Sequence, residues 1–191
     1  MEIRIDILCL GGIGYEKGYL SLMITGLVSG VLSGIIASAC FMFILYGVRP
    51  KISISEKVIF EKAKEGSIIQ IKIANMTKKM INNVDYALYY CLINEDGIND
   101  IKEIPARKSI LRNIAKYDKH DEDAEYAIRI TFNANDLNFP LDENDKLIFV
   151  INAKHSVSNT SVCKIKEYYR DDIFNDGFFE SKTSMKVISR H

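Results

Sequence analysis

One uncharged stretch near the N-terminus constrains this chain more than any other feature. No charged residue occurs between Lys17 and Arg49, which leaves 31 consecutive uncharged positions. An α-helix needs roughly 20 apolar residues to cross about 30 Å of hydrocarbon. The stretch therefore predicts a transmembrane helix, which we assign to residues 19–48. Tyr19 and Tyr46 lie near its two ends, where aromatic side chains favour the membrane interface.

Small residues recur every four positions within this stretch. Four-residue spacing places side chains on one face of a helix, and close contact between small residues is a main source of helix association in lipid. The pattern therefore predicts a homo-oligomer, or pairing with a partner helix. The predicted contact residues are Gly26, Gly30, Gly34, Ser38, Ser29 and Ser33. The alternative is that glycine and serine are simply common in membrane helices.

The charges that flank the stretch predict its orientation. Arg49, Lys51 and Lys57 follow it closely, whereas only Arg4 and Lys17 precede it. Positive residues favour the cytoplasmic side, so we expect the N-terminus outside and the C-terminal domain in the cytoplasm. The stretch is too long for the apolar part of a cleaved signal peptide. The short, Lys-, Ile- and Asn-rich chain has no eukaryotic sorting signal, which favours a bacterial inner membrane.

The remainder, residues 49–191, has the length of one domain with its own core. It carries 23 basic and 22 acidic residues, because residues 1–48 hold two of the 25 basic and three of the 25 acidic residues. This balance argues against a nucleic acid polymer as partner. Residues 1–18 form a short N-terminal segment with a strand-like alternation of isoleucines at 3, 5 and 7.

Short alternating runs after residue 51 predict strands rather than helices. The expected strands lie within 52–60, 67–75, 84–94, 101–106, 126–133, 146–153, 161–169 and 185–188. Only 108–114 has a helix-compatible pattern, and Asp171-Asp172 and Asp176-Gly177 indicate turns. Seven or eight short strands favour an all-β domain, either an immunoglobulin-like sandwich or a small β-barrel.

The residues with reactive side chains do not form a recognisable catalytic or metal-binding pattern. No nucleophile elbow, phosphate loop, HExxH or CxxC pair occurs, so we expect neither an enzyme nor a metal or other cofactor. Cys91 and Cys163 lie in apolar, strand-like runs and are predicted to be buried free thiols, with a disulfide as the alternative.

Two polar or aromatic regions are candidates for a ligand or partner surface. The first is the loop after the strand 146–153, because loops at the ends of a sandwich often bind ligands. The second is 167–180, where aromatic residues lie among charges, as they do at interfaces. The candidate residues are His155, Asn159, Tyr168, Tyr169, Phe178 and Phe179. The alternatives are an ordinary hairpin connection and a loop packed on the edge of the sandwich.

The order and size of these parts resemble the membrane-anchored effectors of bacterial anti-phage signalling systems. In that family an N-terminal transmembrane part carries a small cytosolic β-barrel, which senses a cyclic nucleotide and then damages the inner membrane. The family's best-known members cross the membrane twice, whereas residues 1–18 do not supply a second crossing. The resemblance implies a nucleotide-sensing effector but assigns no binding residue.

The sequence thus leads to two expectations of function. The first is a non-enzymatic single-pass membrane protein whose cytoplasmic β domain binds a ligand or partner, with self-association of its helix in the bilayer. The second, which follows from the resemblance, is an anti-phage defence effector that senses a nucleotide signal and disrupts the inner membrane.

Overall fold

A computed structural model of the 191-residue chain describes most of its length. The described residues are 12–47, 49–63, 66–93, 99–108, 111–135, 137, 141–156 and 158–189. The chain divides into two compact units, Met1–Gly47 and Val48–His191.

The first unit contains a single helix, α1 (Gly12–Gly47), within its described part. Its segment Tyr19–Gly47 is long and apolar enough to cross a membrane. The helix ends one residue before the predicted end at 48 and three residues before Pro50, which disfavours helix at the residue before it. It begins seven residues before the predicted position 19. The strand-like run at residues 1–8 lies outside the described residues.

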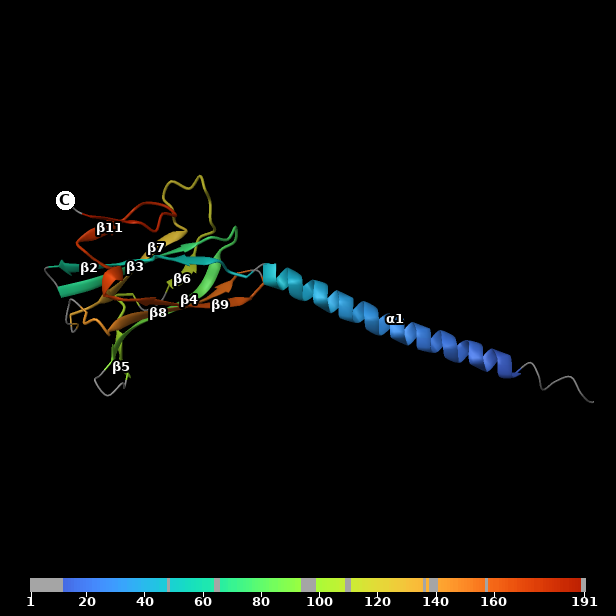
Figure 1. Ribbon diagram of the computed structural model, residues 1–191. Helices are drawn as coiled ribbons and strands as arrows, with labels where there is room; N and C mark the ends of the chain where they lie inside the picture. Colours follow the sequence, from blue (N-terminus) through green and yellow to red (C-terminus); the bar gives the residue numbers. More distant parts are fainter. Residues whose placement is uncertain are drawn as a thin grey trace, which may run out of the picture. The chain divides into compact units, whose positions relative to one another are not determined.

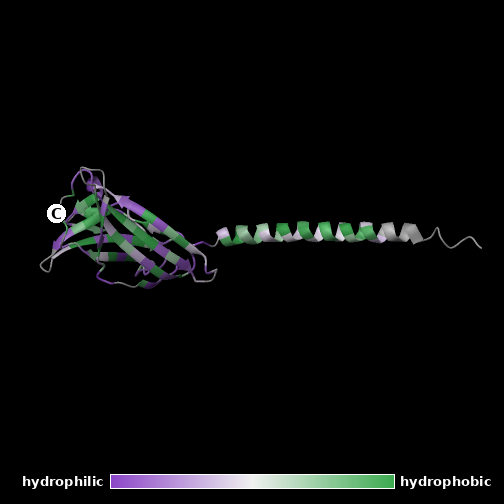
Figure 2. Cartoon of the chain, turned by 90° about the horizontal axis from the view of Figure 1, so that it is seen from below, coloured by the Kyte–Doolittle hydropathy of each residue, from purple (hydrophilic) through white to green (hydrophobic). Residues whose placement is uncertain are grey.

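Almost every side chain from Tyr19 to Gly47 is exposed, so no described residue buries the apolar surface of this segment. Figure 2 shows hydrophobic colour along most of its length. The hydroxyls of Ser33 and Ser38 donate to carbonyl oxygens of the preceding turn, Gly30 O at 3.0 Å and Gly34 O at 2.8 Å. Internal bonds of this kind suit a helix in hydrocarbon, where no water satisfies a hydroxyl.

The second unit is all-β, and its first sheet is centred on β3 (Figure 1). We call this sheet A. Its strands are β1 (Ile52–Ile54), β2 (Val58–Ala63), β3 (Gly66–Asn75), β7 (Ala127–Asn133) and β10 (Ile173–Asn175). Antiparallel β7 pairs with one side of β3, while β1 and β2 share its other side, and β10 runs parallel to β2.

The second sheet, called sheet B, is centred on β4 and β8. Its strands are β4 (Ile81–Ile93), β5 (Asn99–Ile104), β6 (Leu111–Ile114), β8 (Lys146–His155) and β9 (Ser161–Tyr168). β8 pairs with one side of β4, and β5 and β6 share the other side. A short 3-10 helix, η1 (Arg170–Asp172), leads to the C-terminal hairpin of β11 (Gly177–Phe179) and β12 (Val187–Ser189).

The two sheets bury one continuous apolar core between them. In β8, Leu147, Phe149 and Ile151 are fully buried, whereas the residues between them are more exposed. Phe132 of sheet A makes edge-to-face contacts with Phe149 and Tyr86 of sheet B, at ring-centroid distances of 6.2 and 6.0 Å. The prediction of a helix followed by an all-β sandwich is confirmed. The immunoglobulin-like assignment stays a prediction.

The C-terminal segment covers the outer face of sheet A. Figure 1 shows β11 on the side of β2 and β3 away from sheet B. Ile59 and Ile68 point to this outer side and are nevertheless buried. The Nζ of Lys72, also buried, donates hydrogen bonds to the carbonyl oxygens of Glu180 and Ser184. These contacts make the hairpin an integral part of the domain.

Two expectations at the level of single elements are wrong. Residues 111–114, predicted to be helix-compatible, form strand β6, because pairing with β4 brings Leu111 and Ile114 opposite Val84 and Ile81. Cys163 is exposed rather than buried, since it lies on the outward face of β9. Cys91 is buried and free, as predicted.

Tyr90 and Asp145 form the one hydrogen bond between the side chains of two buried residues in the described part of the domain. The Tyr90 hydroxyl donates to Oδ2 of Asp145 at 2.5 Å, and both residues are less than one-tenth exposed. Burial, followed by the hydrogen bond to the Asp145 carboxylate, raises the pKa of the Tyr90 phenol above its ordinary value of 10.0. The phenol therefore stays protonated and keeps donating at neutral pH.

The change Tyr90→Phe is expected to destabilise the domain by about 1–3 kcal/mol, because a buried carboxylate loses its donor. Thermal unfolding of the full chain in detergent measures this. Tyr89→Phe is the control, since the Tyr89 hydroxyl makes no hydrogen bond with a described residue.

The raised pKa of the Tyr90 phenol contributes stability that is lost as pH rises above about 10. The decrease of Tm at alkaline pH should therefore be shallower in Tyr90→Phe than in the unaltered chain. Equal Tm values for both variants would contradict this role.

Candidate functional site

An irregularity in β4 creates a hollow on the outer face of sheet B. The register between β4 and β8 shifts between Asn82 and Asp85, which marks a β-bulge. Asn83 occupies the bulge with a φ of 48°, a left-handed conformation that asparagine tolerates better than most residues. The bulge interrupts the even surface of the sheet beside β6.

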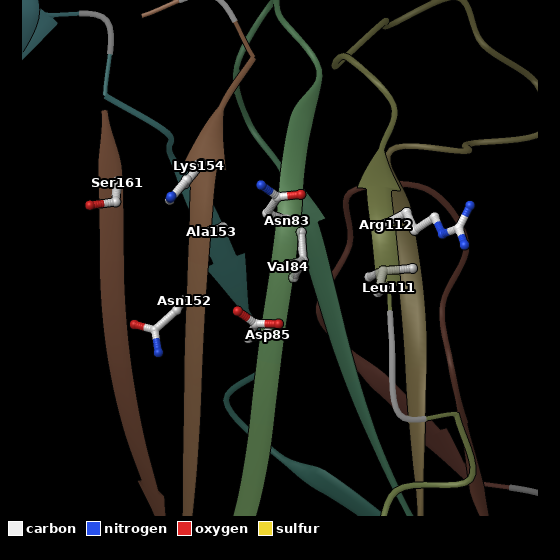
Figure 3. A pocket seen from close by; sticks show the side chains of 9 residues that line it. All are labelled: Asn83, Val84, Asp85, Leu111, Arg112, Asn152, Ala153, Lys154 and Ser161. Carbon is white, nitrogen blue, oxygen red and sulfur yellow. The ribbon is translucent and has the colours of Figure 1, made fainter. Parts of the chain in front are cut away.

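The hollow has a volume of about 320 Å³ and is bordered by four strands, β9, β8, β4 and β6. Its lining residues are Asn83, Val84, Asp85, Leu111, Arg112, Asn152, Ala153, Lys154 and Ser161. Figure 3 shows Ser161, Lys154 and Asn83 across one end and Asn152 and Asp85 across the other, while the side chain of Arg112 extends away from them.

The hollow presents polar side chains that are available to a ligand. Its polar side chains come from Asn83, Asp85, Arg112, Asn152, Lys154 and Ser161, and all six residues are exposed. None of these side chains makes a hydrogen bond or ion pair with a described residue. Asn152 lies opposite Asp85 in the register, and Ser161 lies opposite Lys154. Together they present amides, a carboxylate, a hydroxyl and two cations, which suits a polar ligand with negative charge.

The side chain next to the bulge adds an unsatisfied group. The Oδ1 atom of Asn82 is buried and has no hydrogen-bond partner among the described residues. Buried polar atoms are nearly always paired. Strain at the bulge and a lone buried oxygen therefore occur within two consecutive residues, Asn82 and Asn83, at the border of the hollow.

The predicted loop residues His155 and Asn159 close a turn instead of lining the hollow. His155 is buried, and its Nδ1 accepts a hydrogen bond from the Ser158 N–H at 3.3 Å. The N–H of His155 donates to Thr160 O, and the N–H of Asn159 donates to His155 O. Asn159 is exposed in a left-handed conformation, φ 54°. This geometry agrees with the alternative of an ordinary hairpin connection.

The predicted aromatic residues do not form one surface. Tyr168 is completely buried, and its hydroxyl donates to Ser55 O at 2.8 Å. Phe179 is also buried, which removes both residues from an exposed ligand surface. Tyr169 is half exposed and donates to Glu167 Oε2 at 2.8 Å, whereas Phe178 lies on the hairpin, opposite Ile188. Alternation along each strand separates neighbours onto opposite faces.

The predicted contact residues of the helix all lie within α1, at the expected positions. A β-carbon added at Gly26, Gly30 or Gly34 would meet no atom within 4 Å. A larger side chain at these positions would therefore be tolerated by the isolated chain. Their role in association stays a prediction.

Sequence reasoning missed the hollow, because its residues are spread over four strands. The one local signal is the Asn82-Asn83 pair, which precedes the expected strand 84–94 and lies within β4 in the structure. In the part of the chain that the structure describes, no group of three or more His, Cys, Asp or Glu residues is placed to hold a metal ion.

Comparison with known proteins gives no family. No protein-family model matches the chain, and no curated protein matches it. Among solved structures it is similar to the crystal structure of the periplasmic chaperone SfaE, with a TM-score of 0.39 and 9% sequence identity. The match covers 65% of this chain and 56% of that one. The likeness is too distant to carry an argument about function.

Proposed function

We propose that this protein is a non-enzymatic, single-pass protein of the bacterial inner membrane, whose cytoplasmic β domain binds a ligand or partner. The observation that carries the proposal is the uncharged segment Tyr19–Gly47, whose side chains are exposed along almost its whole length. Exposed apolar surface on this scale is unfavourable in water. A lipid bilayer is the environment that removes this cost.

The orientation of the proposed span rests on charge. Arg49, Lys51 and Lys57 lie just beyond its C-terminal end, and the positive-inside bias assigns this end to the cytoplasm. Cys163 of the β domain is exposed and free, whereas Cys9 precedes the helix in the sequence. These two thiols report on opposite sides of the membrane in the proposed orientation.

The topology is tested with two variants that keep only Cys9 or only Cys163, the other cysteines being changed to serine. In intact spheroplasts, a membrane-impermeant maleimide should label the variant with Cys9 and leave the other unlabelled. After lysis, both should react, which controls for thiol reactivity. Labelling of Cys163 in intact spheroplasts would overturn the cytoplasmic assignment.

Self-association of the span is the second part of the proposal. The double change Gly30→Ile and Gly34→Ile adds bulk where the isolated helix has room, so any effect should arise between helices. We expect about a tenfold shift towards monomer, equivalent to about 1.4 kcal/mol, measured by energy transfer between labelled chains in liposomes. Leu27→Ile with Val31→Ile is the matched control on another face. No difference between the two double variants would argue against a small-residue interface.

The second candidate function is the sensing of a nucleotide signal, and the hollow on sheet B favours it. Arg112 and Lys154 provide positive charge for phosphate groups, and Asp85 and Asn152 provide hydrogen-bonding groups for a base or sugar. A chain that binds such a signal beside a membrane span corresponds to the anti-phage effectors that the sequence resembles, in which binding leads to disruption of the inner membrane.

Titration of the full chain in detergent with cyclic dinucleotides tests this second candidate. Binding should weaken about tenfold or more when Arg112→Ala and Lys154→Ala are combined, because two charge-assisted contacts are lost. The double change Lys57→Ala and Lys62→Ala removes the same charge from β2 of sheet A and the residue before it, and should leave binding unchanged. A flat titration of the unaltered chain would exclude these ligands and leave the anchored binding protein as the proposal.

A further inference from the structure

Strand β7 presents an open edge on the side away from β3. The carbonyl oxygen of Thr131 accepts from the Arg107 N–H at 2.9 Å, and the Asn133 N–H donates to Pro105 O at 2.8 Å. Main-chain groups alternate in direction along a strand, so those of Arg129 point the same way, away from β3. Among the residues that the structure describes, none pairs with the N–H or C=O of Arg129. An unpaired edge of this kind accepts a further strand.

A slit next to this edge opens between the two sheets. Its volume is about 280 Å³, and its lining residues are Tyr86, Arg107, Lys108, Leu111, Ile128, Arg129, Ile130 and Thr131. Ile128 and Ile130 alternate with Arg129 and belong to the interior, and Leu111 and Tyr86 of sheet B pack on the same core. Apolar side chains therefore line the slit together with the Tyr86 ring, whose hydroxyl donates to the carbonyl oxygen of Lys108.

The rim of the slit is positively charged. Arg107, Lys108 and Arg129 are all exposed, and none of them forms an ion pair with a described residue. No carboxylate is among the lining residues of the slit, whereas on the outer face of sheet A Arg129 also borders a second hollow with Glu122, Asp123 and Glu180. Nε of Arg107 donates to Asn133 Oδ1 at 3.2 Å, which holds this guanidinium next to β7. The charge complement of this rim is an acidic segment.

We propose that this edge binds an extended acidic segment of a partner protein, which adds to β7 as a further strand. Alternate side chains of an added strand point to opposite faces. One set would enter the apolar slit beside Ile128 and Ile130, and the other would lie next to Arg129 and Arg107. The site therefore selects a segment in which apolar and acidic residues alternate. Like charge disfavours pairing with β7 of a second copy.

The slit is a second site, separate from the proposed ligand hollow, and it has a different class of partner. The hollow lies on the outer face of sheet B and presents polar side chains. The slit lies at an edge of the sandwich and presents main-chain groups together with apolar side chains. Strand addition obtains affinity from the main chain and specificity from alternate side chains.

Fluorescence anisotropy with short labelled peptides tests the proposal on the full chain in detergent. A peptide in which aspartate and isoleucine alternate should bind, and the equivalent lysine–isoleucine peptide should not. Binding should weaken about tenfold when Arg107→Ala and Arg129→Ala are combined, and it should weaken with added salt. The control pair, Lys57→Ala with Lys62→Ala, should have no effect.

Peptide N-methylation separates strand addition from attraction to surface charge. Methyl groups on one alternate set of amides should abolish binding, because that set faces β7, whereas methyl groups on the other set should be tolerated. Equal binding of both methylated peptides, equal binding of the lysine peptide, or no binding of the acidic peptide would each overturn the proposal. These outcomes leave the proposed membrane topology unaffected, because the peptide measurement does not depend on it.

Discussion

The packing of Phe132 between Phe149 and Tyr86 is the contact on which the β domain depends. It joins the two sheets at the centre of the core, where the inward residues of β7 and β8 meet. Loss of the Phe132 ring would leave a cavity between sheet A and sheet B. The slit at the edge depends on this packing, because its lining residues come from both sheets, whereas the hollow lies on paired strands of sheet B alone.

Much of the domain could be predicted, because alternation directly reflects burial. The run 126–133 alternates clearly and contains β7, whereas 108–114 is too short for its period to separate helix from strand. The strands β10 and β11 were missed because each has three residues and the Asp176 turn separates them. Their pairing with distant strands is decided by tertiary contacts, which no local pattern records.

Neither candidate site could be predicted from the sequence, for a related reason. Asp85 and Asn152 are far apart in the chain and become neighbours only through the register of β4 and β8. Arg107 and Arg129 likewise border the same slit because the backbone at 105–107 pairs with β7. The aromatic run 167–180 attracted attention by composition, but alternation turned Tyr168 and Phe179 inward. Composition identifies residues whose side chains can bind or react, and strand register decides which of them share a surface.

The ammonium of Lys72, held by carbonyl oxygens of the C-terminal segment, has a consequence for how the domain folds. Lys72 belongs to β3, whereas its acceptors Glu180 and Ser184 lie 108 and 112 residues further along the chain. A buried ammonium without acceptors is costly. Burial of Lys72 in sheet A and docking of the C-terminal hairpin are therefore coupled, so that neither is complete without the other.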